Sequence, residues 1–230
     1  MSDPHAIVAL IKMASWGGKR DGAGRKKSVM RRDDVAHRTR PALAKHHPVH
    51  VVLRLDRRNG CRLRCGPVYR ALRRVLERYL GGRDFRVCHI SIQHNHLHLL
   101  VEASDARALT LGMQSFAIRA ARAINRALRR GGKLFPHRYH ATQIINARQA
   151  RNALAYVLNN WRRHREDLRD PRAWRAKLDP YSSAVSFRAW RGEPRWKLPA
   201  DYVPLPVSLP ATRLLGSIRS LDPFHCPGPL

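Results

Sequence analysis

The sequence predicts an α+β fold in which an antiparallel sheet carries helices packed on one face. Two observations support this prediction. Strand-like and helix-like segments alternate in a β-α-β-β-α-β order, and the helix-like segments repeat apolar residues every three to four positions. With 230 residues the chain is long enough for one domain with extensions.

The first half of this pattern comprises a strand, a helix and two further strands. Residues 50–55 form an apolar run typical of a strand, and residues 68–80 place valine and leucine at helical spacing before two glycines. Residues 85–93 and 97–102 are predicted to be the second and third strands, joined by a tight connection.

The second half begins with a long helix at residues 106–129, for which Ser104-Asp105 offers an N-cap. A short strand at 139–145 and a helix at 147–163 follow. Residues 179–230 show no strong periodicity, so we expect an irregular segment that wraps around the domain.

The chain is strongly basic. Lysine and arginine number 45 against 16 aspartate and glutamate, which gives a formal net charge of +29. A charge of this size favours a polyanionic partner and makes binding depend on salt through counterion release. Nucleic acid is therefore the expected partner.

The sequence predicts a cytoplasmic, nucleoid-associated protein with no membrane contact. No window approaches the roughly 18 uninterrupted apolar residues of a membrane span. The apolar stretch at residues 6–11 lacks the basic leader and cleavage site of a signal peptide. The four cysteines show no paired CxxC spacing, so we expect free thiols at Cys61, Cys65, Cys88 and Cys226.

Composition divides the chain into three parts. Residues 1–48 are basic and punctuated by glycine, and we expect a flexible DNA-binding arm there. Residues 49–165 hold the predicted domain, and residues 166–230 form a basic extension that contains proline and tryptophan. The basic residues of the arm expected to contact DNA are Arg25, Lys26 and Lys27.

Two histidines stand at alternate positions of the third predicted strand. Successive side chains of a strand point to opposite faces, so His96 and His98 project together while Leu97 and Leu99 face the other way. Two imidazoles on one face can hold one metal ion. Histidines with this spacing also occur on ordinary solvated strands, so the pattern alone does not decide between the two interpretations.

A tyrosine and an asparagine occur one turn apart on the last predicted helix. Tyr156 and Asn160 are at i and i+4, which places them on one helix face, and Asn159 is an alternative to Asn160. An amide oxygen of Asn160 beside His96 and His98 would complete a site for magnesium or manganese. Tyr156 would attack a DNA phosphodiester, although a helical tyrosine is more often a packing residue.

These features together resemble the single-tyrosine HUH transposases, and more closely their REP-associated branch. The resemblance covers about residues 40–190, with the central domain at 49–165. It is carried by His50-Val51-Val52-Leu53-Arg54, Asn95-His96-Leu97-His98-Leu99-Leu100-Val101, Gly132-Lys133-Leu134-Phe135, Arg138-Tyr139-His140 and Tyr156-Val157-Leu158-Asn159-Asn160.

The resemblance implies a ferredoxin-like fold, a divalent metal on the two histidines, and cleavage of single-stranded DNA through a 5′-phosphotyrosine. It also implies recognition of hairpins from repeated palindromes, by a monomer or a homodimer. Arg138 and His140 lie in a segment of the resemblance and are expected to contact phosphate.

The chain departs from the family pattern at three places. Trp161 stands where family members commonly have proline, and Gln93-His94 stands where related chains often have Met-Pro. In the C-terminal motif around residues 210–215, Arg213 occupies a tryptophan position. The altered C-terminal motif keeps open an alternative in which the protein binds DNA or RNA hairpins without cleaving them.

Overall fold

The structure is a computed structural model that describes residues 42–44, 47–56, 60–169, 178–192, 200–223 and 225–228. Residues 1–41 lie outside the described part. The contacts expected from Arg25, Lys26 and Lys27 therefore stay predictions.

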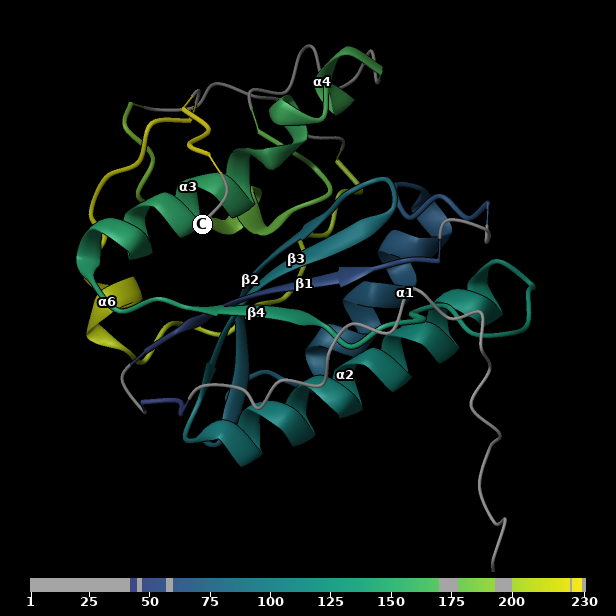
Figure 1. The fold of residues 1–230 in the computed structure, drawn as a ribbon. Coiled ribbons are helices and arrows are strands. Elements are labelled where there is room, and N and C mark those ends of the chain that lie inside the picture. Colours follow the sequence, from purple (N-terminus) through teal and green to yellow (C-terminus); the bar gives the residue numbers. More distant parts are fainter. Residues whose placement is uncertain are drawn as a thin grey trace, which may run out of the picture. The chain divides into compact units, whose positions relative to one another are not determined.

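A four-stranded antiparallel sheet forms the centre of the described chain (Figure 1). Its strands are β1 (Val49–Arg54), β2 (Phe85–Ile92), β3 (His96–Ala103) and β4 (His140–Gln143), in the order β2-β3-β1-β4. With the helices described below, this is the β-α-β-β-α-β arrangement of ferredoxin-like folds. The predicted α+β class is confirmed.

Three long helices begin where the sequence supplies a start signal. In α1 (Gly66–Glu77) a proline occupies the first turn, where it removes no helical hydrogen bond. In α2 (Ala106–Ala127) the Asp105 carboxylate accepts from the Ala108 N–H at 2.7 Å. In α3 (Ala147–Arg163) the Asn146 side chain accepts from the Gln149 N–H.

Helices α1 and α2 cover one face of the sheet and form the larger core. β3 supplies Leu97, Leu99 and Val101 to this core, all of them fully buried. Gly112 lets α2 approach β2, because a Cβ atom there would overlap the ring of Phe85. This layer is the one that the sequence predicted.

Helix α3 lies on the opposite face of the sheet, as Figure 1 shows. The prediction placed all helices on one face, and α3 corrects it. The reason is that Cys88 of β2 and Leu100 of β3 point to this second face, where they form a second core with Ala153 and Val157 of α3. The apolar side of a third helix is needed to remove them from water.

The C-terminal part of the described chain wraps around the domain with little regular structure, as predicted. It contains α4 (Glu166–Arg169), the 3₁₀ helix η2 (Ser183–Ser186) and α6 (Arg213–Gly216). Arg64 makes a bidentate pair with Asp179 at 2.9 and 3.0 Å, which ties this segment to the domain. No helix among the described residues has the length and apolarity needed to span a bilayer.

Candidate active site

The two histidines of the HxH pattern lie side by side on β3. His96 and His98 are 5% and 3% exposed, and their Nε2 atoms are 2.9 Å apart. Both imidazoles face α3 rather than the larger core, as the alternation of the strand predicts.

The outer nitrogens of both rings have defined partners. The Nδ1 atom of His96 lies 2.7 Å from the side-chain oxygen of Asn95, and an amide oxygen only accepts. Nδ1 of His96 therefore carries the proton, and its Nε2 holds a lone pair when the ring is neutral. Nδ1 of His98 lies 3.0 Å from Nε2 of His50, which is itself buried on β1. A protonated outer nitrogen orients an imidazole toward a metal through Nε2.

Three polar side chains share one face of α3, because Tyr156, Asn160 and His164 follow one another at intervals of four residues, and the first and last of them contact the histidines. The ring of Tyr156 meets that of His98 edge-on, with 5.2 Å between centroids. It meets the ring of His50 in the same way at 5.8 Å. His164, the C-cap of the helix, brings its ring within 5.2 Å of His96.

The two adjacent asparagines of α3 have different surroundings. The amide nitrogen of Asn159 donates to the carbonyls of Asp222 and His225, at 3.1 and 2.8 Å, so it holds the C-terminal segment, while its side-chain oxygen has no hydrogen-bond partner. Asn160 is fully buried, yet neither its amide nitrogen nor its oxygen has a hydrogen-bond partner. A buried amide without a partner is costly unless a ligand satisfies it.

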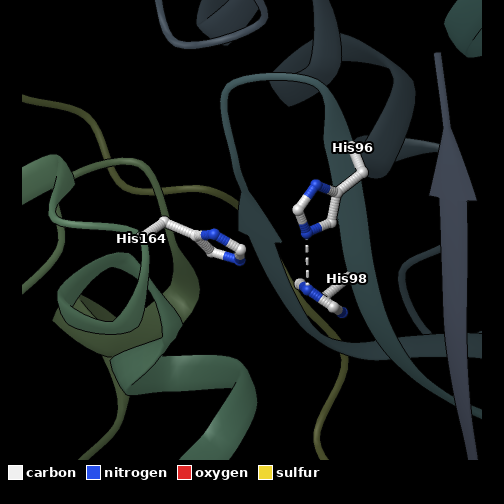
Figure 2. A group of neighbouring side chains, drawn as sticks. All are labelled: His96, His98 and His164. Atoms are coloured by element: carbon white, nitrogen blue, oxygen red, sulfur yellow. Dashed lines mark hydrogen bonds between the residues drawn. The ribbon is translucent and has the colours of Figure 1, made fainter. Parts of the chain in front are cut away.

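The donor set fits a divalent metal ion. Ligand nitrogens of His96, His98 and His164 all lie within 4.8 Å of one another, and Figure 2 shows the three rings turned toward a common point. Two bare Nε2 atoms 2.9 Å apart repel each other unless a proton or a cation lies between them. Imidazole nitrogen with an amide oxygen suits manganese and related ions, whereas magnesium prefers oxygen ligands.

Burial and nearby cations keep these imidazoles neutral. Burial lowers the pKa of His96 to about 3, and the charges of His164 and Arg54 lower it further. The pKa of His98 is lowered by burial and by His96, and burial with His140 lowers the pKa of His50 to about 4. Neutral rings are the form that binds metal.

Tyr156 is mostly enclosed, with 7% of its surface exposed. Burial raises the pKa of its phenol, while Arg163 and Arg54 lower it. The phenol therefore stays protonated at neutral pH in the absence of further positive charge. A tyrosine in this state needs a cation or a base before it can act as a nucleophile.

The remaining predicted residues lie apart from the histidines or at their edge. His140 is exposed on β4, opposite Val52 in the register, and acts on the nearby His50 through its charge. Arg138 is exposed two residues before the start of β4. Glu102, left outside the predicted site, accepts three hydrogen bonds from Ala211 and Thr212 and so holds the start of α6.

Three residues near the site were not identified from the sequence. His50 and Arg54 occupy the face of β1 that pairs with His98 and His96, and only the strand register reveals this placement. His164 could have been found, because it continues the four-residue spacing of Tyr156 and Asn160. The exposed Arg54 lies directly opposite His96 and brings a permanent positive charge to the site.

Comparison with known proteins gives a family for the chain. The sequence model of the family described as "Transposase IS200 like" matches residues 44–160. A search of curated protein sequences finds no significant match.

Two solved structures match part of the chain. One is of a REP-associated tyrosine transposase bound to a REP hairpin, with 15% sequence identity and a TM-score of 0.48 over 66% of this chain and 84% of that chain. The other is of a bacterial tRNA(His) guanylyltransferase-like protein in complex with ATP, with 10% identity and a TM-score of 0.39 over 59% and 68% of the two chains. The family match spans half of the sequence and includes β1, β3 and most of α3, up to Asn160. The chain therefore belongs to the IS200-like transposase family.

Proposed function

We propose that the protein is a metal-dependent single-stranded DNA strand transferase that uses Tyr156 as its nucleophile. The observation that carries the proposal is the meeting of Tyr156 with His98 on one side of the sheet, with the unpartnered amide of Asn160 one helical turn beyond Tyr156. Packing alone accounts for a buried tyrosine, but it does not account for a buried, unsatisfied amide on the same helix face.

The proposed reaction is a transesterification. The phenolic oxygen of Tyr156 forms a bond to phosphorus, and the bond between phosphorus and the 3′ oxygen breaks. The phenol loses its proton to solvent, and the leaving 3′ oxygen takes one up. The products are a 5′-phosphotyrosine and a free 3′ hydroxyl, which can later reverse the reaction at another DNA end.

The residues of the site have separate roles in this proposal. His96, His98 and Asn160 hold a divalent cation, magnesium or manganese, which polarises a phosphoryl oxygen when bound. His164 adds a third imidazole beside them. Arg54 neutralises phosphate charge as the fifth bond to phosphorus forms. His50 holds His98 in the orientation that directs Nε2 toward the cation.

The proposed substrate is a DNA hairpin from palindromic repeats, which the REP-associated motifs of the sequence imply. Tyr156 and His98 belong to the same chain and are in ring contact, so a single protomer holds both groups. This favours attack in cis and requires no dimer. Exposed Arg138 and His140 are proposed to contact the DNA backbone at the edge of β4.

A hairpin-binding protein that no longer cleaves is the second candidate. The observation that favours it is the enclosure of Tyr156, which is only 7% exposed. A nucleophile must reach phosphorus, so the DNA would have to displace neighbouring residues first. The two candidates differ in whether a covalent product forms.

A covalent capture experiment tests the proposal. The full-length protein is incubated with 3′-labelled single-stranded hairpins from the DNA flanking its own gene, with manganese or with chelator. We expect a denaturation-resistant labelled adduct that requires metal and maps to Tyr156. Tyr156→Phe should abolish the adduct and leave hairpin affinity nearly unchanged.

The matched control is Tyr79→Phe, because Tyr79 bonds to Ser115 on the other side of the sheet. This variant should retain the adduct. An equal adduct from Tyr156→Phe would contradict the nucleophile assignment. Tight hairpin binding with no adduct under any metal would favour the non-cleaving protein.

The metal ligands are tested by binding rather than by activity. Manganese affinity of the DNA-free protein, measured by calorimetry, should fall more than about tenfold in Asn160→Ala. Asn159→Ala is the matched control, because Asn159 bonds to the C-terminal segment, and its manganese affinity should stay close to that of the wild type. Equal affinities in the two variants would remove Asn160 from the ligand set.

A further inference from the structure

A groove lined by arginine lies between α1 and α2. Its volume is about 850 Å³, and its floor is formed by small aliphatic residues such as Ala71, Val75 and Ala123. Six exposed arginines, three from each helix, line it. They are Arg70, Arg74 and Arg78 of the α1 side and Arg119, Arg122 and Arg126 of α2.

The described part of the chain offers no carboxylate that compensates the charge of this groove. Glu77 is the acidic residue among those that line it, and its carboxylate already pairs with Arg73 at 2.7 Å. Within the part of the chain that the structure describes, none of the six groove arginines forms an ion pair with a carboxylate. Six like charges in one groove repel one another, so an external anion is the natural counterpart.

The arginines form two stripes that match an extended anion. On the α1 side the arginines are spaced at intervals of four residues, and on α2 they are spaced at intervals of three and four. Each stripe therefore follows one side of its helix. At 1.5 Å per residue each stripe is about 10–12 Å long. One DNA strand carries a phosphate about every 3.4 Å of helix axis, so about three phosphates fit along a stripe.

The lining residues favour a duplex over a single strand. Proteins that bind single strands stack the bases on aromatic side chains. The residues that line this groove are arginine, alanine, valine, proline and glutamate, with no aromatic ring among them. Such a surface offers charge to a phosphate backbone and no aromatic platform on which successive bases stack. We propose that the α1/α2 groove binds the phosphate backbone of duplex DNA, independently of sequence.

The groove and the histidine site lie on opposite faces of the sheet, since α1 and α2 cover one face and α3 the other (Figure 1). The duplex in the groove is thus a DNA segment outside the reacting strand, such as the stem of a hairpin. The choice of DNA rests on the proposed function. The argument from charge, that the groove binds the phosphate backbone of a duplex, is independent of the proposed function.

Salt-dependent binding to a plain duplex tests the groove. The full-length wild type and the triple variant Arg74→Gln, Arg122→Gln, Arg126→Gln are titrated with a labelled 20-base-pair DNA lacking single-stranded ends, at several salt concentrations. We expect about tenfold weaker binding of the variant near physiological salt. The slope of log affinity against log salt should become shallower by about 0.9 for each phosphate that the variant no longer neutralises.

A matched control carries the same loss of charge elsewhere. Arg83, Arg107 and Arg148 are exposed and lie outside the groove, so their triple change to glutamine should leave both slope and affinity close to wild type. A groove variant with lysine at the three positions should keep most of the slope, which shows that charge is what matters. Equal losses in the groove and control variants would overturn the proposal.

Two further measurements separate this proposal from the proposed function. Adduct formation on a short single-stranded oligonucleotide should be unchanged in the groove variant, because the groove is remote from Tyr156. If the wild type forms no adduct but the groove variant still loses duplex binding, the groove proposal stands alone. Tighter binding of the groove to duplex RNA than to duplex DNA would overturn the assignment to DNA.

Discussion

The two faces of β3 serve different purposes, although they alternate along a single strand. Leu97 and Leu99 point to the α1/α2 core and are fully buried among apolar side chains. His96 and His98 point to α3 and are almost as buried, but among imidazoles, a phenol and an unpaired amide. The same degree of burial therefore stabilises the folded state on the leucine face and costs free energy on the histidine face.

This difference separates stability from chemistry within one element. Removing leucine from water stabilises the fold by about 25 cal/mol for each Å² of apolar surface. Burying imidazoles lowers their pKa and costs free energy, as His96 illustrates with a pKa of about 3. The α1/α2 face gives β3 a rigid base, and the α3 face holds groups that a metal ion would satisfy.

The largest expected effect on folding comes from the apolar face. Leu99→Ala should lower the free energy of unfolding by about 2–5 kcal/mol, because it leaves a cavity beneath the sheet. Denaturant unfolding measures this loss. Leu111→Ala is the control, since Leu111 is 54% exposed on α2 and its truncation should change stability by less than about 0.5 kcal/mol. Similar losses in both variants would contradict the role of Leu99 in the core.

A smaller effect, on metal affinity rather than folding, is expected at His50. His50→Phe removes the partner of the His98 Nδ1 atom and should weaken manganese binding about 10- to 100-fold in calorimetry. His50→Gln retains an amide oxygen that can accept from His98, so it should recover much of that affinity. If both variants bind manganese equally, His50 acts only in packing.

The smallest effect concerns His89, a histidine of the α3 face that is not among the proposed metal ligands. Burial lowers the pKa of His89 to about 4, and its Nδ1 atom lies 3.3 Å from the Ser183 hydroxyl. The unfolded chain binds a proton near pH 6.5, so the folded state binds fewer protons between pH 6.5 and 4, and stability falls as the pH falls through this range.

Unfolding measured at pH 7 and pH 5.5 isolates this contribution. The wild type should lose about 1 kcal/mol more than His89→Gln over this interval, because glutamine does not titrate. The other buried histidines contribute equally to both proteins and cancel in the difference. Identical losses in the two proteins would show that His89 is not the group responsible.

Local patterns in the sequence were sufficient for most elements. The helix at 147–163 agrees with α3 in both bounds, and the helix at 106–129 begins after the Ser104-Asp105 pair that the sequence indicated, with Asp105 as the cap. These agreements arise because caps and apolar spacing act over a few residues. The alternation of β3 likewise predicted that His96 and His98 share one face.

The sequence by itself thus determined the element types, the basic charge, the histidine pair and the spacing of Tyr156 and Asn160. The tertiary structure alone decided that α3 covers the second face, that the Asn160 amide nitrogen lacks a partner while that of Asn159 has two, and that His50 and Arg54 join the site. The physical reason is the distance along the chain over which each interaction acts. Helix and strand periodicity are local, whereas strand register and the burial of a side chain depend on segments about 50 or more residues away in the chain.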